Sequence, residues 1–140
     1  MLTLDNIAEQ ITDIYLNEEY WHEKKLTREE AIRYHKRLIE KGAIYYHEEN
    51  EKVVGYMECW RINAKQLNRI KHHESFSAIS EDINNGTIGF LANVWINKQY
   101  RNNEVAKDFK KFWDKKTYNC NLIAGMRKNK ELRIHRNTGV

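Results

Sequence analysis

Two polar residues, Glu58 and Asn93, interrupt apolar runs of the sequence, and Glu58 carries a side chain that can transfer a proton. Glu58 lies within Val53–Trp60, and Asn93 lies within the apolar run that ends at Ile96. A carboxylate inside an apolar strand can act as a general base, and an amide in a similar place can point into a cleft. A place on the exposed face of a strand explains Glu58 equally well, and hydrogen bonding at a sheet edge explains Asn93.

A change of period within Asn93–Phe112 predicts a strand, a turn and a helix. Residues up to Ile96 are rich in β-branched and aromatic types, whereas Val105, Phe109 and Phe112 fall at helical spacing. The helix start carries backbone N–H groups without intrahelical partners, and these form a ready site for an anion. The turn between strand and helix is therefore a candidate binding site.

The remaining periodicity predicts an α+β (or α/β) domain with a mixed sheet, a single domain over residues 1–140. A capping box at Thr27–Glu30 opens the best-defined helix, and a short charged link joins two strands into an antiparallel hairpin. The strand Leu122–Met126 is wholly apolar, so we expect it to be parallel to its neighbour and buried on both faces. The expected elements are helices from Leu4 to about Asn17, Thr27–Gly42, Asn63–Glu74, from Asn103 and Lys130–Arg136, strands Ala43–His47, Val53–Trp60, Thr87–Ile96 and Leu122–Met126, and a polar loop Ser75–Asn85.

Composition narrows the class of protein and of ligand. The sequence contains no apolar stretch long enough to span a membrane and no signal-peptide core, and Cys59 and Cys120 are expected to be buried free thiols in a reducing cytoplasm. Residues 97–140 carry 12 Lys and Arg against 4 Asp and Glu, so this half is basic. A phosphate-rich ligand, either a nucleotide cofactor or nucleic acid, fits that charge, as does an ordinary solvated helix face.

The run Ile96–Ala106 resembles the acetyl-CoA-binding segment of the GNAT superfamily of N-acyltransferases. That family has a hydrophobic strand, then a Gln/Arg-x-x-Gly-x-Gly/Ala turn that opens a helix, and here Arg101 and Ala106 fit its first and last positions. The order of elements from residue 27 onward also follows the family core, and Lys128–Val140 resembles its last conserved helix.

The resemblance implies an N-acetyltransferase that moves an acetyl group from acetyl-CoA to an amine on a small molecule or a protein. It implies that backbone groups of Val94, Trp95 and Ile96 hold the pantetheine arm and that the following turn binds the pyrophosphate. His135 takes the place of the family's tyrosine, so it is a candidate general acid for the leaving thiolate, although an ordinary surface role is an alternative. The remaining candidate cofactor residues are Arg101, Asn102, Asn103, Glu104, Val105, Ala106 and Lys107, with Lys98 also able to reach a phosphate.

The sequence departs from the family pattern in ways that favour other hypotheses. Glu104 stands in the position of the central glycine, where it adds negative charge and also stabilises the helix through its dipole. The usual first strand and last strands are missing, which predicts sheet edges covered by a partner chain or a second copy. A catalytically silent GNAT-like subunit, or a basic nucleic-acid-binding protein, is therefore the alternative function. We expect no metal site, because His72 and His73 are adjacent and point in different directions on a helix.

Overall fold

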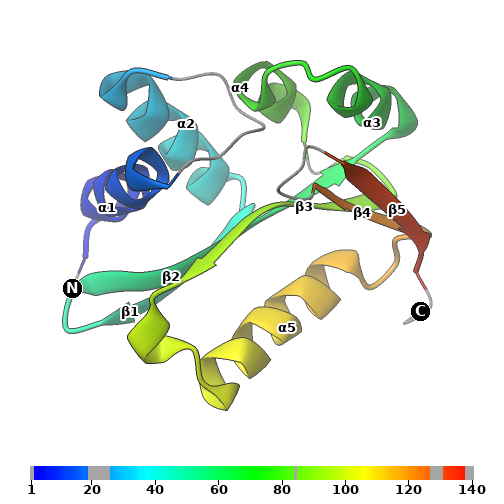
Figure 1. Ribbon diagram of the computed structural model, residues 1–140. Coiled ribbons are helices and arrows are strands. Elements are labelled where there is room, and N and C mark those ends of the chain that lie inside the picture. The colour runs from blue at the N-terminus through cyan, green and yellow to red at the C-terminus, as the bar shows by residue number, and fades with distance from the viewer. Residues whose placement is uncertain (1, 19–25, 84, 127–130, 138–140) are drawn as a thin grey trace.

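The computed structural model describes residues 2–18, 26–83, 85–126 and 131–137, and these form a mixed sheet with helices on both faces (Figure 1). The expected α+β class is confirmed. The helices are α1 (Leu4–Asn17), α2 (Arg28–Glu40), α3 (Ala64–Lys71), α4 (Phe76–Ile79) and α5 (Asn103–Thr117), with 3₁₀ turns at Ser80–Asp82 and Lys98–Tyr100. The strands are β1 (Ile44–Glu49), β2 (Lys52–Ile62), β3 (Ile88–Ile96), β4 (Leu122–Met126) and β5 (Leu132–Arg136).

Local capping chemistry fixes the ends of the first two helices. The Thr3 side chain accepts a hydrogen bond from the backbone N–H of Asn6 and so caps α1. In α2 the predicted capping box is present, because Thr27 and Glu30 each bind the other's backbone N–H. Gly42 follows α2 with φ of 69°, a left-handed conformation that favours glycine and turns the chain into β1.

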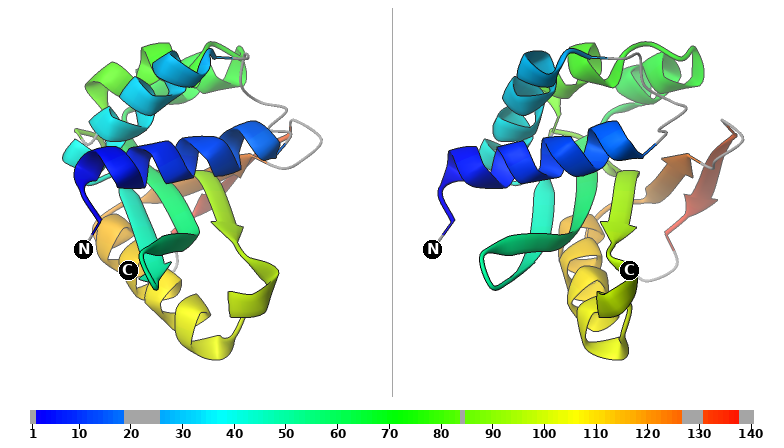
Figure 2. Two further views of the ribbon diagram at one scale, coloured as in Figure 1. Left: turned by 90° about the vertical axis from the view of Figure 1, so that its left-hand side faces the viewer. Right: turned by 60° about the vertical axis from the view of Figure 1, so that its left-hand side comes forward.

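The strands lie in sequence order, β1-β2-β3-β4-β5, and only β3 and β4 are parallel. The α5 crossover between β3 and β4 makes the parallel pair possible. Helices α1 to α4 cover one face of the sheet and α5 covers the other (Figures 1 and 2). Any side chain of β2 or β3 therefore points either toward the α1–α4 layer or toward α5.

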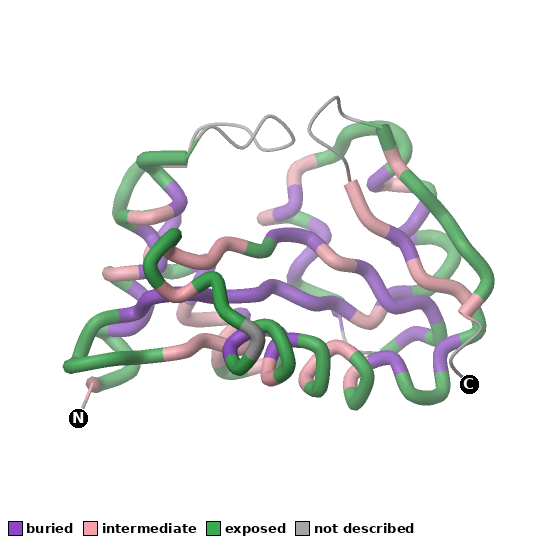
Figure 3. The backbone as a smooth tube through the Cα atoms, turned by 60° about the horizontal axis from the view of Figure 1, so that its bottom comes forward, coloured by how far each residue is buried: buried purple, intermediate pink, exposed green. Residues whose placement is uncertain are grey.

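The core is divided by the sheet into two parts. On the α1–α4 side, the rings of Trp60, Phe76 and Phe90 meet edge to face with centroids 5.0 to 5.6 Å apart. On the other side, Cys59 of β2 packs with Phe109 of α5. The buried segments follow the central strands and the inner faces of the helices (Figure 3).

Gly89 sets how closely the end of α5 approaches the sheet. A Cβ atom at Gly89 would lie 2.4 Å from Cγ2 of Thr117, so only glycine leaves room for this contact. Thr117, at the end of α5, therefore lies directly against β3, and the N-terminal end of the helix lies beyond the last residue of that strand (Figure 1).

Three sequence expectations were wrong. The segment expected as a last helix forms β5 over Leu132–Arg136, which pairs with β4. Leu132 and Ile134 lie two residues apart on one face of this strand, and Leu132 packs against the core whereas Ile134 is exposed. Lys130 lies outside the described residues. The strand β4 is not buried on both faces: Ala124 is buried and its neighbours are half-buried. The expected loop Ser75–Asn85 contains α4, whose Phe76 and Ile79 are buried.

Two further expectations concern the thiols and the membrane. Cys59 and Cys120 are both free and buried, as predicted. Within the described part of the chain, no helix has the length and apolar character needed to cross a bilayer.

Candidate functional site

Strand β3 parts from β4 halfway along its length. Its first half pairs with β4 from Ile88–Leu122 to Leu91–Gly125, and beyond Leu91 the described residues give it no strand on that side. On the opposite side the register with β2 shifts between Glu58 and Cys59, which leaves Ala92 as an extra residue in a β-bulge. Residues 93–96 thus present backbone groups along an edge inside the sheet that β4 does not cover.

A buried carboxylate lies directly opposite the start of this free edge. Glu58 pairs with Asn93 across the β2–β3 ladder, so both side chains point toward the α1–α4 layer. The Glu58 side chain is fully buried. Its Oε2 accepts hydrogen bonds from the Tyr34 hydroxyl (2.7 Å) and the Trp60 indole N–H (2.9 Å). Its Oε1 is buried without a hydrogen-bond partner among the described residues.

Burial raises the pKa of Glu58 to about 7, although hydrogen bonds from Tyr34 and Trp60 lower it. The nearby Asn93 amide lowers this pKa further without forming a hydrogen bond of normal geometry to Oε1. A carboxyl group with this pKa exchanges its proton near neutral pH, as a general acid or base must. Its placement opposite a free strand edge therefore marks Glu58 as a candidate proton carrier.

His35 of α2 is a second buried titratable group in the same layer. Its Nδ1 lies 2.9 Å from the Thr12 hydroxyl, and its ring packs edge to face against Tyr34 and Tyr56. Burial lowers its pKa to about 3, so the imidazole stays neutral through the physiological range. His35 therefore has a packing role among Tyr34, Tyr56 and Thr12, and it does not exchange protons at neutral pH.

In the turn after β3, the Asn102 side chain binds backbone groups at the start of α5. Asn102 is the N-cap of α5, and its Oδ1 accepts hydrogen bonds from the backbone N–H groups of Glu104 (3.0 Å) and Val105 (3.1 Å). Arg101 turns back toward the strand, where its Nε donates to the carbonyl oxygen of Ile96 (2.8 Å). The turn has the predicted strand–turn–helix shape, and its own residues occupy these donors.

Solved structures with this arrangement share one fold. The chain is similar to GphF, a GNAT-like decarboxylase in complex with isobutyryl-CoA, with a TM-score of 0.56 and 11% identity over 86% of this chain and 61% of that chain. It is similar to the loading GNATL domain of CurA from Lyngbya majuscula, with a TM-score of 0.51 and 17% identity over 86% of this chain and 60% of that one. The chain has the GNAT fold. It spans about three fifths of each of these two chains.

The GNAT likeness is one of structure alone. No protein-family model matches the sequence, and no curated protein matches it significantly. The identities are low enough that only the arrangement of elements is shared, and function has to be argued from the site.

The GNAT resemblance predicts that the edge of β3 holds a pantetheine arm, and the structure fits this half of the cofactor. Val94 and Ile96 point toward α5, as their pairing with Met57 and Gly55 requires, and Val94 is 47% exposed. Trp95 points to the other face and packs against the main core. An extended pantetheine arm lying along residues 93–96 would meet the backbone groups of the strand edge and the exposed side chain of Val94.

The turn that a GNAT cofactor's pyrophosphate would occupy does not fit an anion in the same way. A hollow of about 520 Å³ lies beside it, lined by His47, Glu49, Tyr100, Asn102, Glu104, Val105 and Asp108. The carboxylates of Glu49, Glu104 and Asp108 give this hollow negative charge, and His47 is paired with Glu49 at 3.1 Å. No group of three His, Cys, Asp or Glu in the described residues is arranged to hold a metal ion.

The candidate residues of the sequence are thus only partly brought together. Glu58 and Asn93 face one another, whereas His135 lies on β5, exposed and opposite Ile123, on the α5 side of the sheet. Glu104, Ala106 and Lys107 are exposed on the first turns of α5, and Val105 is buried against the sheet. The side chain of Asn103 lies outside what the structure describes. His135 therefore belongs to a different surface from the Glu58 cluster.

Sequence reasoning missed the partners of Glu58 and the acidic character of the hollow. Trp60 stands two residues after Glu58, which places both side chains on one face of a strand, and this signal was present in the sequence. Tyr34 comes from α2, and no local pattern links it to Glu58. Glu49 and Asp108 reach the hollow from β1 and from the second turn of α5, a juxtaposition that only the fold provides.

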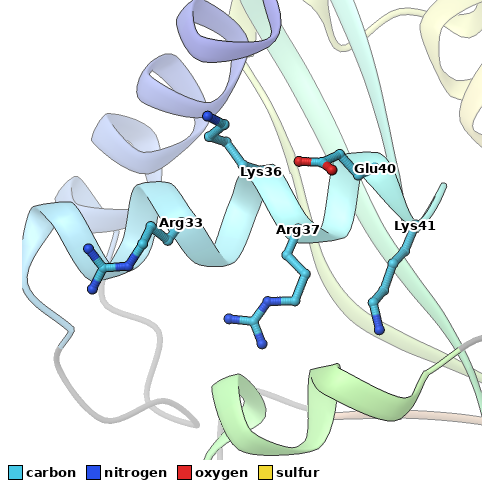
Figure 4. A pocket seen from close by; sticks show the side chains of 5 residues that line it. All are labelled: Arg33, Lys36, Arg37, Glu40 and Lys41. Atoms are coloured by element: carbon cyan, nitrogen blue, oxygen red, sulfur yellow. The ribbon is translucent and has the colours of Figure 1, made fainter.

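A second hollow, of about 360 Å³, lies on α2 and is lined by Arg33, Lys36, Arg37, Glu40 and Lys41 (Figure 4). Several of its cations are engaged: Lys36 pairs with Asp5 at 2.7 Å, Arg37 contacts Ser77 and Ser80, and Lys41 donates to the Ser80 carbonyl (3.3 Å). These contacts join α2 to α1 and α4. The hollow lies on the face of the sheet opposite α5, so it does not extend the candidate site (Figure 1).

Proposed function

We propose that this protein transfers an acyl group from a pantetheine thioester to an amine, with acetyl as the acyl group. One observation carries the proposal: the edge of β3 becomes free at Asn93, directly opposite a buried carboxyl group whose pKa is about 7. The isobutyryl-CoA in one structure of the same fold supports an acyl thioester as the donor.

The reaction needs a proton acceptor, and Glu58 supplies it. The amine nitrogen attacks the thioester carbonyl carbon, the new C–N bond forms, and the C–S bond breaks. Glu58 Oε1, which has no hydrogen-bond partner among the described residues, takes the proton that the amine loses, and that proton passes on to the leaving thiolate. Tyr34 and Trp60 hold Oε2 and fix the plane of the carboxylate, and Asn93, the first residue of the free edge, faces Glu58 across the ladder.

Thiol release and product mass test this function. Purified protein is mixed with acetyl-CoA or S-acetylpantetheine and with spermidine or a lysine-containing peptide, and free thiol and acetylated amine are measured. We expect amine-dependent thiol release with kcat/KM rising through pH 7, because a base works only after it has lost its proton.

The variant Glu58→Gln keeps the size of the side chain and removes the base. It should lower kcat by about 10²-fold or more and abolish the rise with pH. Glu48→Gln, an exposed carboxylate on β1, is the matched control and should behave as the wild type. The absence of amine-dependent thiol release from either donor, or full activity in Glu58→Gln, would show that the proposed function is wrong.

A further inference from the structure

We infer that the acyl donor is a pantetheine thioester that places no nucleotide diphosphate at the start of α5. This inference rests on the proposed function and narrows its substrate class. The shared chemistry is a neutral pantetheine arm carrying an acyl group on sulfur, either as a free small molecule or attached through its phosphate to a carrier protein.

The first ground is that three backbone N–H groups at the start of α5 are already bonded. The N–H groups of Glu104 and Val105 bind the Asn102 side chain at 3.0 and 3.1 Å, and the N–H of Ala106 binds the Asn102 carbonyl oxygen at 3.1 Å. A diphosphate bound at a helix start takes such N–H groups for itself. Here it would first have to displace the Asn102 cap, which a glycine-rich turn would not require.

The second ground is the charge around the turn. Glu104 and Asp108 project from the first turns of α5, and Glu49 reaches the same hollow from the end of β1. A diphosphate placed beside these carboxylates is repelled, because like charges a few Å apart disfavour one another. Arg101, the residue at the first position of the family's turn, has its Nε committed to the Ile96 carbonyl oxygen at the end of β3.

The third ground is that the neutral part of the donor meets a largely free strand edge, although the Ile96 carbonyl oxygen there is already bonded to Arg101. Residues 93–96 lie beyond the last β3–β4 pair, so alternate backbone N–H and C=O groups there face no strand among the described residues. A pantetheine arm carries two amide groups and no charge, and strand edges bind such extended chains through backbone hydrogen bonds. The site therefore suits the arm and opposes the diphosphate.

The experiment compares S-acetylpantetheine with acetyl-CoA, using calorimetry for binding and thiol release for turnover. For the wild type we expect the dissociation constants and kcat/KM values of the two donors to agree within about threefold. A third donor, an acetylated phosphopantetheine carrier protein, distinguishes the source of the pantetheine. A higher kcat/KM than with S-acetylpantetheine shows that the natural donor is attached to a carrier protein, and a lower kcat/KM shows that it is a free thioester.

Variants of the turn make the comparison specific. Asn102→Gly combined with Glu104→Gly frees the N–H groups and removes one carboxylate, so acetyl-CoA should bind at least tenfold more tightly while S-acetylpantetheine changes less than twofold. Glu104→Gln removes the charge alone and keeps the helix start, which guards against a misfolded double variant. Glu29→Gln, an exposed carboxylate in the first turn of α2, is the matched control and should change neither donor.

Two results would overturn the inference in different ways. A wild type that binds or uses acetyl-CoA at least tenfold better than S-acetylpantetheine rejects the inference and leaves the acyltransferase function in place. A wild type that binds neither donor rejects both.

Discussion

Glu58 and His35 are buried titratable residues whose effects on stability oppose one another. The raised pKa of Glu58 means that the folded state keeps its proton from about pH 4.5 to 7 while the unfolded state loses it, so stability falls as pH rises through that window. The lowered pKa of His35 means that the unfolded state gains a proton below about pH 6.5 and the folded state does not, so stability falls as pH drops toward 3. Between about pH 4.5 and 6.5 the two slopes cancel.

Single substitutions should separate these slopes. Relative to the wild type, Glu58→Gln should gain about 1.4 kcal/mol of unfolding free energy for each pH unit raised between about 4.5 and 7, and His35→Asn should show the opposite trend from about 6.5 down to 3. Urea unfolding across pH 3 to 8 measures both, and Glu48→Gln should run parallel to the wild type. A pH-independent difference between Glu58→Gln and the wild type would contradict a raised pKa at Glu58.

At the scale of elements, the start of α2 is the clearest case of a local signal that determines structure. Thr27 accepts from the Glu30 N–H at 3.2 Å, and the Glu30 carboxylate accepts from the Thr27 N–H at 3.0 Å. We expect Thr27→Ala to lower the unfolding free energy by about 1 kcal/mol, because α2 loses its cap oxygen. Thr27→Ser keeps that oxygen and should cost much less. Chemical denaturation measures both, and equal losses in the two variants would argue against the capping role.

The elements also show where sequence reasoning stops. The cap at Thr27, the hairpin of β1 and β2 and the change of period at Asn97–Asn103 are local, and the structure bears them out. Leu132 and Ile134 fall in a segment expected to be helical, although their spacing of two residues is that of a strand. Pairing with β4 makes this segment a strand. Pairing between two segments of the chain cannot be predicted from the sequence of one segment alone.

The candidate site shows the same division. Glu58 and Asn93 were each visible as polar interruptions of apolar runs, but their pairing depends on the β2–β3 register, which includes the bulge at Ala92. The sequence does not single out the Asn102 cap, because asparagine is common before a helix. The cap matters here because it occupies N–H groups that an anion at this turn would need. Glu104 was visible as a departure from the family pattern, and the fold adds Glu49 and Asp108 beside it.

For the whole molecule, the strand β5 determines how the outer edge of the sheet meets other chains. The strand β5 is the last strand on its side in the described structure, and β4 is its partner. It is short, and Arg133, His135 and Arg136 are exposed on it, with Ile134 37% exposed between them. Exposed edges bind other strands unless charge or shape prevents it.

The charges on β5 argue against pairing with a second copy. An antiparallel β5–β5 pair can set Arg133 opposite Arg136, and like charges directly across a ladder are destabilising, although the Arg133 guanidinium also pairs with Glu131 of its own chain at 3.1 Å. We therefore expect the wild type to remain monomeric by light scattering up to high concentration at low salt. Arg133→Glu would set opposite charges across the same pair, so this variant should dimerise.

The matched control is Arg28→Glu, a charge reversal at the start of α2 on a different surface, and it should stay monomeric. Hydrogen exchange identifies the interface, because backbone pairing would protect the amides of residues 132–136 in the Arg133→Glu dimer. A wild type that dimerises at low salt with the same amides protected would contradict the charge argument. In the expected case, cationic side chains keep β5 from pairing with its own copy, because like charges would meet across the ladder.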